Sequence, residues 1–230
     1  MKIRTSLKAI MVLAGALFLL VYPISSKATT LTFDYNFEFS AGTDPAGPAP
    51  WLRATFNDEI NQGKVRLTMS TMGLTGSEFT SIWVFNLNPN LTAASLGIAA
   101  IDITDSNPIV FTTGTDFYKA DGDGYYDIKF DFPNSANDNR FTAGEEVIID
   151  ITYSGVGTFN ANSFNFMSSP GGGAGTFLAA THVQGIGTGA QFSGWVAPGP
   201  DHQVPEPGIL ILLGIGMTAA GVASRWIRKI

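Results

Sequence analysis

Apolar and polar residues alternate in short runs through residues 29–197 of this chain. Because successive side chains of a strand point to opposite faces, such alternation predicts strands with one buried face. Residues 31–39, with the sequence LTFDYNFEF, show the pattern most clearly. Helical periodicity of useful length is not found in this region, although residues 91–100 fit one or two helical turns. The other runs that we expect to form strands are 51–56, 64–69, 81–87, 100–103, 127–132, 146–153, 163–167, 177–183 and 192–196.

The segments between these runs are rich in turn-forming residues, as in TDPAGP at 43–48 and SPGGG at 169–173. Many short strands separated by such turns favour an all-β fold, and we predict a single antiparallel β-sandwich of jelly-roll type over residues 29–197. Repeats of 20–50 residues are not visible, which disfavours a propeller or a solenoid.

The first 28 residues have the three parts of a secretory signal peptide. Basic residues precede an uncharged apolar run at 9–21, and Ser26 and Ala28 are small residues at the two positions that signal peptidase reads. We expect cleavage after Ala28. An uncleaved anchor is the alternative, but a helix of this run would span only about 20 Å, less than the hydrocarbon core of a bilayer.

A second uncharged apolar run at 208–224 is followed by a basic cluster of Arg225, Arg228 and Lys229. A helix over 208–227 would be about 30 Å long, so we predict a transmembrane helix there, with a buried core helix as the alternative. The basic cluster would remain cytoplasmic, which places the region between the two apolar runs outside the cytoplasm.

Directly before this predicted helix lies the sequence Val204-Pro205-Glu206-Pro207. The motif, the helix and the basic cluster together make residues 204–230 resemble the PEP-CTERM sorting signal of Gram-negative bacteria. The resemblance implies transient anchoring in the inner membrane and cleavage near the motif by an exosortase, a membrane-embedded cysteine protease or transpeptidase. Prolines restrict their neighbours to extended backbone, which suits a processing site. Residues 198–203 are expected to be a flexible spacer.

The middle of the chain also resembles the ectodomains that commonly precede PEP-CTERM tails. The similar segments include DGDGYYDI at 121–128 and RFTAGE at 140–145. Such ectodomains are mostly of unknown function, so this likeness supports the predicted fold and says little about the role of the domain.

The charge of the chain is unevenly distributed. The whole chain has a formal charge of −6, but residues 29–204 contain six Lys and Arg against eighteen Asp and Glu, or −12. This balance argues against nucleic acid as a partner and makes a divalent cation more plausible. The absence of cysteine excludes disulfides, thiol catalysis and thiolate metal sites.

The densest acidic segment carries four aspartates that are candidate calcium ligands: Asp116, Asp121, Asp123 and Asp127. Calcium prefers six to eight oxygen ligands, which carboxylates on a glycine-rich loop can supply. The spacing is not that of an EF-hand, because Tyr125 occupies position 5 and Phe132 occupies position 12. The segment is therefore interpreted either as another type of calcium loop or as an acidic hairpin turn. No other cofactor is expected.

Tyr125 and Tyr126, next to the acidic segment, are the candidate exposed aromatic pair for stacking on a sugar, whereas Trp83 is expected in the core. Sequence motifs of nucleotide-binding, serine-hydrolase or zinc enzymes are not found. His182 lies in an apolar strand pattern and is interpreted as structural.

From these features we expect an exported protein of the cell envelope, cell surface or extracellular matrix. Its expected role is structural or adhesive, without catalysis, and its expected processing partners are signal peptidase and an exosortase. One alternative is a carbohydrate-binding module for exopolysaccharide, assisted by calcium. Another is a glycan-active enzyme, which would require two carboxylates about 5–10 Å apart in a groove.

Overall fold

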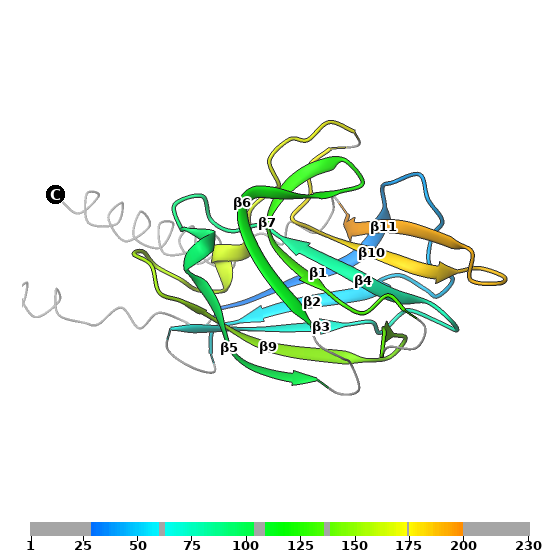
Figure 1. Cartoon of the computed structure of the whole chain (residues 1–230), viewed down its shortest axis with the longest axis horizontal. Helices are drawn as coiled ribbons and strands as arrows, with labels where there is room; N and C mark the ends of the chain where they lie inside the picture. Colours follow the sequence, from blue (N-terminus) through cyan, green and yellow to red (C-terminus); the bar gives the residue numbers. More distant parts are fainter. Residues whose placement is uncertain (1–28, 60–62, 104–108, 136–138, 174, 200–230) are drawn as a thin grey trace, which may run out of the picture.

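The computed structural model describes residues 29–59, 63–103, 109–135, 139–173 and 175–199 (Figure 1). The expected signal peptide (1–28) and the apolar segment at 208–227 lie outside these residues. Among the residues described, no helix is long and apolar enough to cross a membrane.

Strands dominate the described chain, as the alternation predicts. In β2 and β3 the pattern is regular, with every second side chain buried. The elements in chain order are β1 (Thr30–Glu38), β2 (Leu52–Asn57), β3 (Lys64–Ser70), β4 (Phe79–Phe85), the 3-10 helix η1 (Ala93–Ser95), β5 (Leu96–Ile103), β6 (Val110–Ala120), β7 (Asp123–Asp131), β8 (Phe141–Thr142), β9 (Glu146–Tyr153), the 3-10 helix η2 (Ala161–Phe164), β10 (Ala179–Ile186) and β11 (Phe192–Pro198).

Nine of the ten expected strands are confirmed, and the helical turn expected within 91–100 is η1. The strand expected at 163–167 is wrong, because the chain there forms η2 and then a loop. A capping box explains the difference: the Asn160 and Ser163 side chains each accept a hydrogen bond from the other's backbone N–H, which favours the helical turn. Conversely, β6 was not expected, because it is a sheet edge whose two faces are both partly exposed and it does not alternate.

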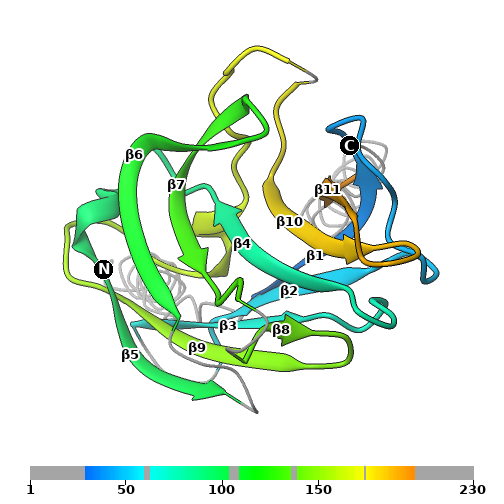
Figure 2. The same cartoon turned by 45° about the vertical axis from the view of Figure 1, so that its right-hand side comes forward.

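All strand pairings are antiparallel, in the order β5-β9-β3-β2-β1-β11-β10-β4-β7-β6, with β8 added beside β4. The all-β fold is therefore confirmed. The expected jelly-roll sandwich of two separate sheets is replaced by one continuous sheet that curls until it is nearly closed (Figure 2). Pairing of β1 with both β2 and β11 joins the two halves, and a register shift between Tyr35 and Phe37 accompanies the bend.

The curled sheet encloses an aromatic core. Phe56 from one half stacks on Phe164 of η2 at a centroid separation of 4.2 Å and meets Phe85 of the other half edge-on at 5.2 Å. Trp83 is fully buried in the same core and packs edge-on against Tyr35, as expected. These contacts across the interior stabilise the curl.

A second, smaller apolar layer covers the outer face of β4 and β10. Val84 faces this layer because its neighbours on β4 face the main core. The tip of the β6–β7 hairpin contributes Tyr126, and the loop between η2 and β10 contributes Phe177. In Figure 1 the hairpin tip and this loop lie side by side above β4, and this is where most of the candidate site residues lie.

Candidate functional site

A cavity of about 190 Å³ opens where β4 ends. Its wall comes from residues 86–93, which follow β4, from β6 and β7, and from residues 166–169. Asn86, Asn88, Asp116 and Asp127 contribute polar groups, and leucine, phenylalanine and methionine side chains contribute apolar surface. Two of the four predicted aspartates therefore share one cavity. The two asparagines were missed because single amides after a strand carry no sequence signal.

Asp127 holds the wall of this cavity in place. Its Oδ2 accepts the Leu87 N–H at 2.8 Å, and its Oδ1 accepts the Asp116 N–H at 2.8 Å. Burial raises the pKa of Asp127, the two N–H donors oppose that rise, and the nearby Asp116 charge adds to it. The carboxyl group thus ties the segment after β4 to β6, where Asp116 adopts a positive φ of 49°.

Asp123 lies in a separate and more enclosed position. Its residue is only 3% exposed, and within the described chain its Oδ1 has no hydrogen-bond partner. Gly173 lies directly against this carboxylate, since a Cβ added there would be 1.5 Å from Oδ1. The carboxylate is therefore covered by the loop that precedes β10.

The four predicted aspartates do not converge on one point. Asp121 is exposed in the β6–β7 turn, where its charge acts on His182. The positive φ values of Asp121 (50°) and Gly122 (82°) are those that a tight hairpin turn requires. In the part of the chain that the structure describes, no group of three or more His, Asp or Glu side chains could hold a metal ion together.

The expected exposed pair of tyrosines is not present, and this prediction is corrected. Tyr126 is fully buried in the outer layer, because the loop before β10 covers it. Tyr125 is partly exposed, with the Lys119 ammonium 4.5 Å from the centre of its ring. Adjacent strand residues face opposite sides, so the two rings could not form one stacking platform.

His182 is packed on the outer face of the sheet, in keeping with the structural role expected for it. Its ring stacks on Trp195 of β11 with centroids 4.9 Å apart and an interplanar angle of 18°. Burial lowers the pKa of His182, and the Asp121 charge opposes this. The neutral imidazole is therefore the favoured form in the folded protein.

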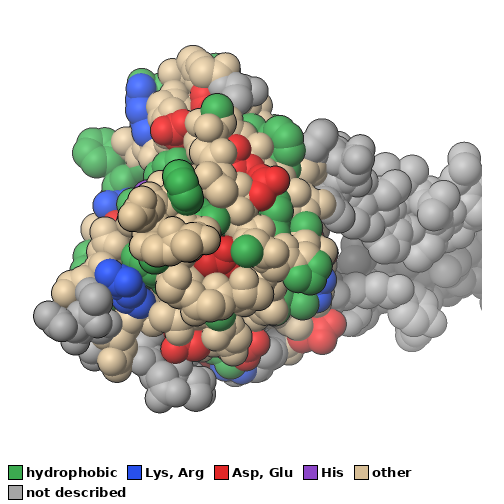
Figure 3. Space-filling view, turned by 90° about the vertical axis from the view of Figure 1, so that its right-hand side faces the viewer, with side chains coloured by type: hydrophobic (Ala, Val, Ile, Leu, Met, Phe, Trp, Pro, Cys, Tyr) green, Lys and Arg blue, Asp and Glu red, His purple; other side chains and the backbone are tan. Residues whose placement is uncertain are grey.

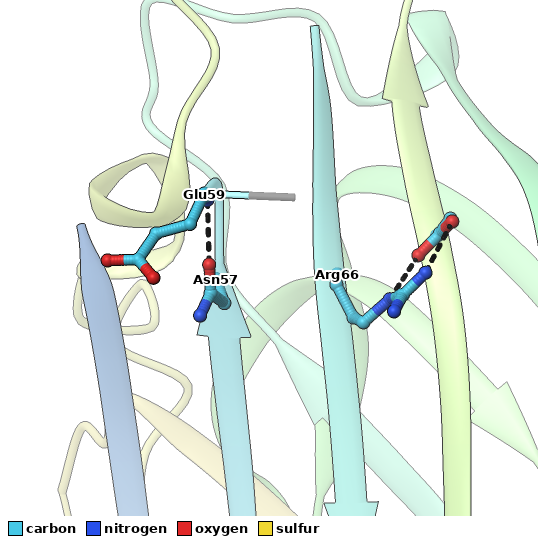
Figure 4. Close-up of polar contacts among 4 residues, drawn as sticks. Asn57, Glu59 and Arg66 are labelled. Carbon is cyan, nitrogen blue, oxygen red and sulfur yellow. Dashed lines mark hydrogen bonds and ion pairs between the residues drawn. The ribbon is translucent and has the colours of Figure 1, made fainter. Parts of the chain in front are cut away.

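Ion pairs, two between neighbouring strands and one within β7, engage half of the Lys and Arg residues of the described chain. Arg53 binds Asp34 and Arg66 binds Asp150 through two hydrogen bonds each, and the guanidinium of Arg66 lies against the carboxylate on β9 in Figure 4. A third pair joins Lys129 and Asp131. On the face shown in Figure 3, acidic, basic and hydrophobic side chains are scattered among other side chains and backbone.

Another contact in Figure 4 stabilises the end of β2. The Oδ1 atom of Asn57 accepts the Glu59 N–H at 2.7 Å, which turns the chain as it leaves the strand. This contact belongs to β2, whereas the cavity is lined by residues that follow β4 and by residues of β6 and β7. It stabilises a turn and is not part of the candidate site.

The sorting residues predicted from the sequence all lie outside the described residues: Ser26, Ala28, Val204, Pro205, Glu206, Pro207, Arg225, Arg228 and Lys229. For this part of the chain, comparison with known proteins is informative. Neither the curated proteins nor the solved structures contain a match to the chain. Among protein families, residues 203–229 match the family described as the PEP-CTERM protein-sorting motif. The chain is therefore a protein that carries a PEP-CTERM sorting signal, as the Pro-Glu-Pro sequence and its flanks predicted.

Proposed function

We propose that this protein is exported, sorted and cleaved by an exosortase, and then acts as a structural or adhesive component of the cell surface or extracellular matrix. The match of residues 203–229 to the sorting motif carries this proposal. The motif implies an exosortase as processing enzyme, and the signal-peptide features of residues 1–28 imply signal peptidase as the other. The role needs no catalysis.

The geometry of the domain is compatible with this processing. The last strand of the described residues, β11, ends at Pro198, and five residues separate it from Val204. A fully extended chain of five residues spans at most about 18 Å. The folded domain therefore ends close to the motif, while the spacer gives an enzyme at the membrane surface access to the Pro-Glu-Pro segment.

Processing can be tested by comparing two variants in the native host. The motif variant carries Pro205→Ala, Glu206→Gln and Pro207→Ala, and we expect it to accumulate as uncleaved, membrane-associated protein. The matched control carries Pro200→Ala and Asp201→Asn, which remove a proline and a carboxylate outside the matched residues. Immunoblots of membrane and extracellular fractions measure the result, and normal release of the motif variant would refute the proposal.

A second proposed function, binding of an exopolysaccharide, is favoured by the cavity after β4. Asn86, Asn88, Asp116 and Asp127 line it together with apolar residues, and the Asn86 amide is held in place by donating to the Phe177 and Leu178 carbonyls. A sugar presents hydroxyls and apolar C–H faces, which suit a concave site with a few fixed polar groups. Both oxygens of Asp127 already accept backbone N–H groups, which suits a role in holding the wall better than one in proton transfer.

Binding can be tested by affinity electrophoresis of the protein through gels that contain the host exopolysaccharide. We expect retardation that is lost in Asn88→Ala and in Asp116→Asn but kept in Asp121→Asn, whose side chain is exposed outside the cavity. Unchanged mobility of all proteins would refute binding. Release of reducing sugar by the unmodified protein, but not by Asp116→Asn, would instead support the glycan-active enzyme.

A further inference from the structure

Two loops meet backbone to backbone on the outer face of the sheet. The Tyr125 N–H donates to the Ser169 carbonyl at 2.7 Å, and the Ser169 N–H donates to the Tyr125 carbonyl at 3.1 Å. Gly171 lies so close to Gly124 that an added Cβ would be 2.8 Å from the Gly124 nitrogen. The turn at 121–124 and the loop at 168–173 therefore form one packed unit.

Two buried side-chain oxygen atoms of this region, Oδ1 of Asp123 and the hydroxyl of Tyr126, have no hydrogen-bond partner among the described residues. Oδ1 of Asp123 makes no hydrogen bond within the described residues, although the side chain is almost wholly buried. The hydroxyl of Tyr126 faces Ser168 and feels the Asp123 charge, yet no hydrogen bond of good geometry reaches it from the described chain. Buried charges in proteins are paired or coordinate a metal, so an oxygen pair of this kind requires a partner.

We propose that a calcium ion binds between these two loops, with the buried Asp123 carboxylate as its charged ligand. The further donors available are backbone carbonyls of the 121–124 turn, of which the Gly122 oxygen faces Gly171, and the Tyr126 hydroxyl. Carboxylate, carbonyl and hydroxyl oxygens are the ligands that calcium accepts.

The surroundings favour calcium over the other cations. The ammonium group of Lys119, on the same hairpin, is engaged over the ring of Tyr125. Magnesium keeps several of its waters and demands octahedral geometry, whereas the Asp123 residue is only 3% exposed. One carboxylate with neutral donors predicts a weak site, with a Kd of about 10⁻⁴–10⁻³ M, as in other extracellular calcium modules.

The test is thermal unfolding of the full-length chain in a mild detergent, with 10 mM calcium or with chelator. At a Kd of about 1 mM, calcium would shift the folding equilibrium about elevenfold and raise Tm by about 3–6 °C. We expect Asp123→Asn to abolish this shift and Asp121→Asn, an exposed carboxylate of the same turn, to keep it. Magnesium at the same concentration is expected to give less than half the shift.

Terbium supplies a second measurement that does not depend on how stable the Asp123 variant is. Tyrosine excitation should sensitise bound terbium, and Tyr126→Phe should reduce that luminescence strongly, with calcium competing it away. The proposal is overturned if calcium does not change Tm, if Asp121→Asn loses the shift as fully as Asp123→Asn does, or if Tyr126→Phe leaves the luminescence unchanged. These two measurements involve neither exosortase processing nor a polysaccharide. A negative result would therefore refute the calcium site and leave the sorting and polysaccharide proposals unchanged.

Discussion

The close contact between Gly173 and the Asp123 carboxylate gives a quantitative test of the loop packing. Gly172 and Gly173 both have positive φ values, 89° and 82°. A Cβ added at Gly172 meets nothing within 4 Å, whereas a Cβ at Gly173 would lie 1.5 Å from Oδ1 and 2.6 Å from Cγ of Asp123. The two positions therefore have nearly the same backbone conformation. Alanine at Gly173 would collide with the Asp123 carboxylate, whereas alanine at Gly172 would meet no neighbouring atom.

The expected costs follow from these two situations. Gly172→Ala should cost about 1–2 kcal/mol, since a left-handed backbone disfavours a Cβ by that amount. Gly173→Ala bears the same backbone cost and in addition must displace a buried carboxylate, and overpacking of this kind costs about 1–3 kcal/mol. We therefore expect Gly173→Ala to be less stable than Gly172→Ala by about 2 kcal/mol, or roughly 4–8 °C in Tm.

Urea unfolding followed by tryptophan fluorescence measures both variants, and a double-mutant cycle isolates the contact. In an Asp123→Ala background the obstructing carboxylate is gone, so Gly173→Ala should cost no more than Gly172→Ala. Equal destabilisation by the two glycine substitutions in the unmodified background would refute the reasoning, because the carboxylate would then not be held beneath Gly173.

Three other predictions concern the core and the pH dependence of stability. Phe56→Ala should cost about 3–5 kcal/mol in urea unfolding because its ring is fully buried, while Val156→Ala, at a residue 94% exposed, should stay within about 0.5 kcal/mol. Arg66 lowers the pKa of Asp150, so this pair stabilises the fold above the ordinary carboxyl pKa of about 3.9 and loses its effect as pH falls through the lowered folded value. Asp150→Asn should thus cost about 1 kcal/mol at pH 7 and nothing at strongly acidic pH, and an equal loss at both would contradict the assignment. Burial lowers the pKa of His182, so the free energy of unfolding should decrease as pH falls through about 6.5, and His182→Gln should remove this slope.

Most strands could be predicted from the sequence because one face of each is buried. β2 and β3 alternate regularly between core and partly exposed positions, and the sequence repeats that period. β6 escaped prediction for the opposite reason: as the edge of the sheet it has few buried positions, and Phe117 on it is 71% exposed. The curl into one sheet depends on pairing of β1 with β11, a long-range contact that no local pattern encodes.

The candidate site was predicted less well than the strands. Spacing alone placed Asp116, Asp121, Asp123 and Asp127 on one acidic loop, but a hairpin turn and a strand separate them. Asp127 lies four residues into β7, and its carboxylate faces the segment after β4, which is forty residues earlier in the chain. Burial of Tyr126 likewise depends on the loop before β10. Tertiary packing, rather than local sequence, therefore decides which of these side chains can meet a ligand.

The sorting signal follows closely on the strand that completes the described sheet. The sheet consists of β5-β9-β3-β2-β1 on one side and β11-β10-β4-β7-β6 on the other, and the pairing of β1 with β11 joins them. The Gly199 N–H donates to Oδ1 of Asn36 at 2.8 Å and fixes the end of β11 against β1. Since β11 is the final strand of the described chain, this joint cannot form until the chain is present as far as Pro198. Only five residues then separate the joint from Val204. The motif therefore follows the strand that completes the described sheet, so this sheet can close only when the chain is complete to within five residues of Val204.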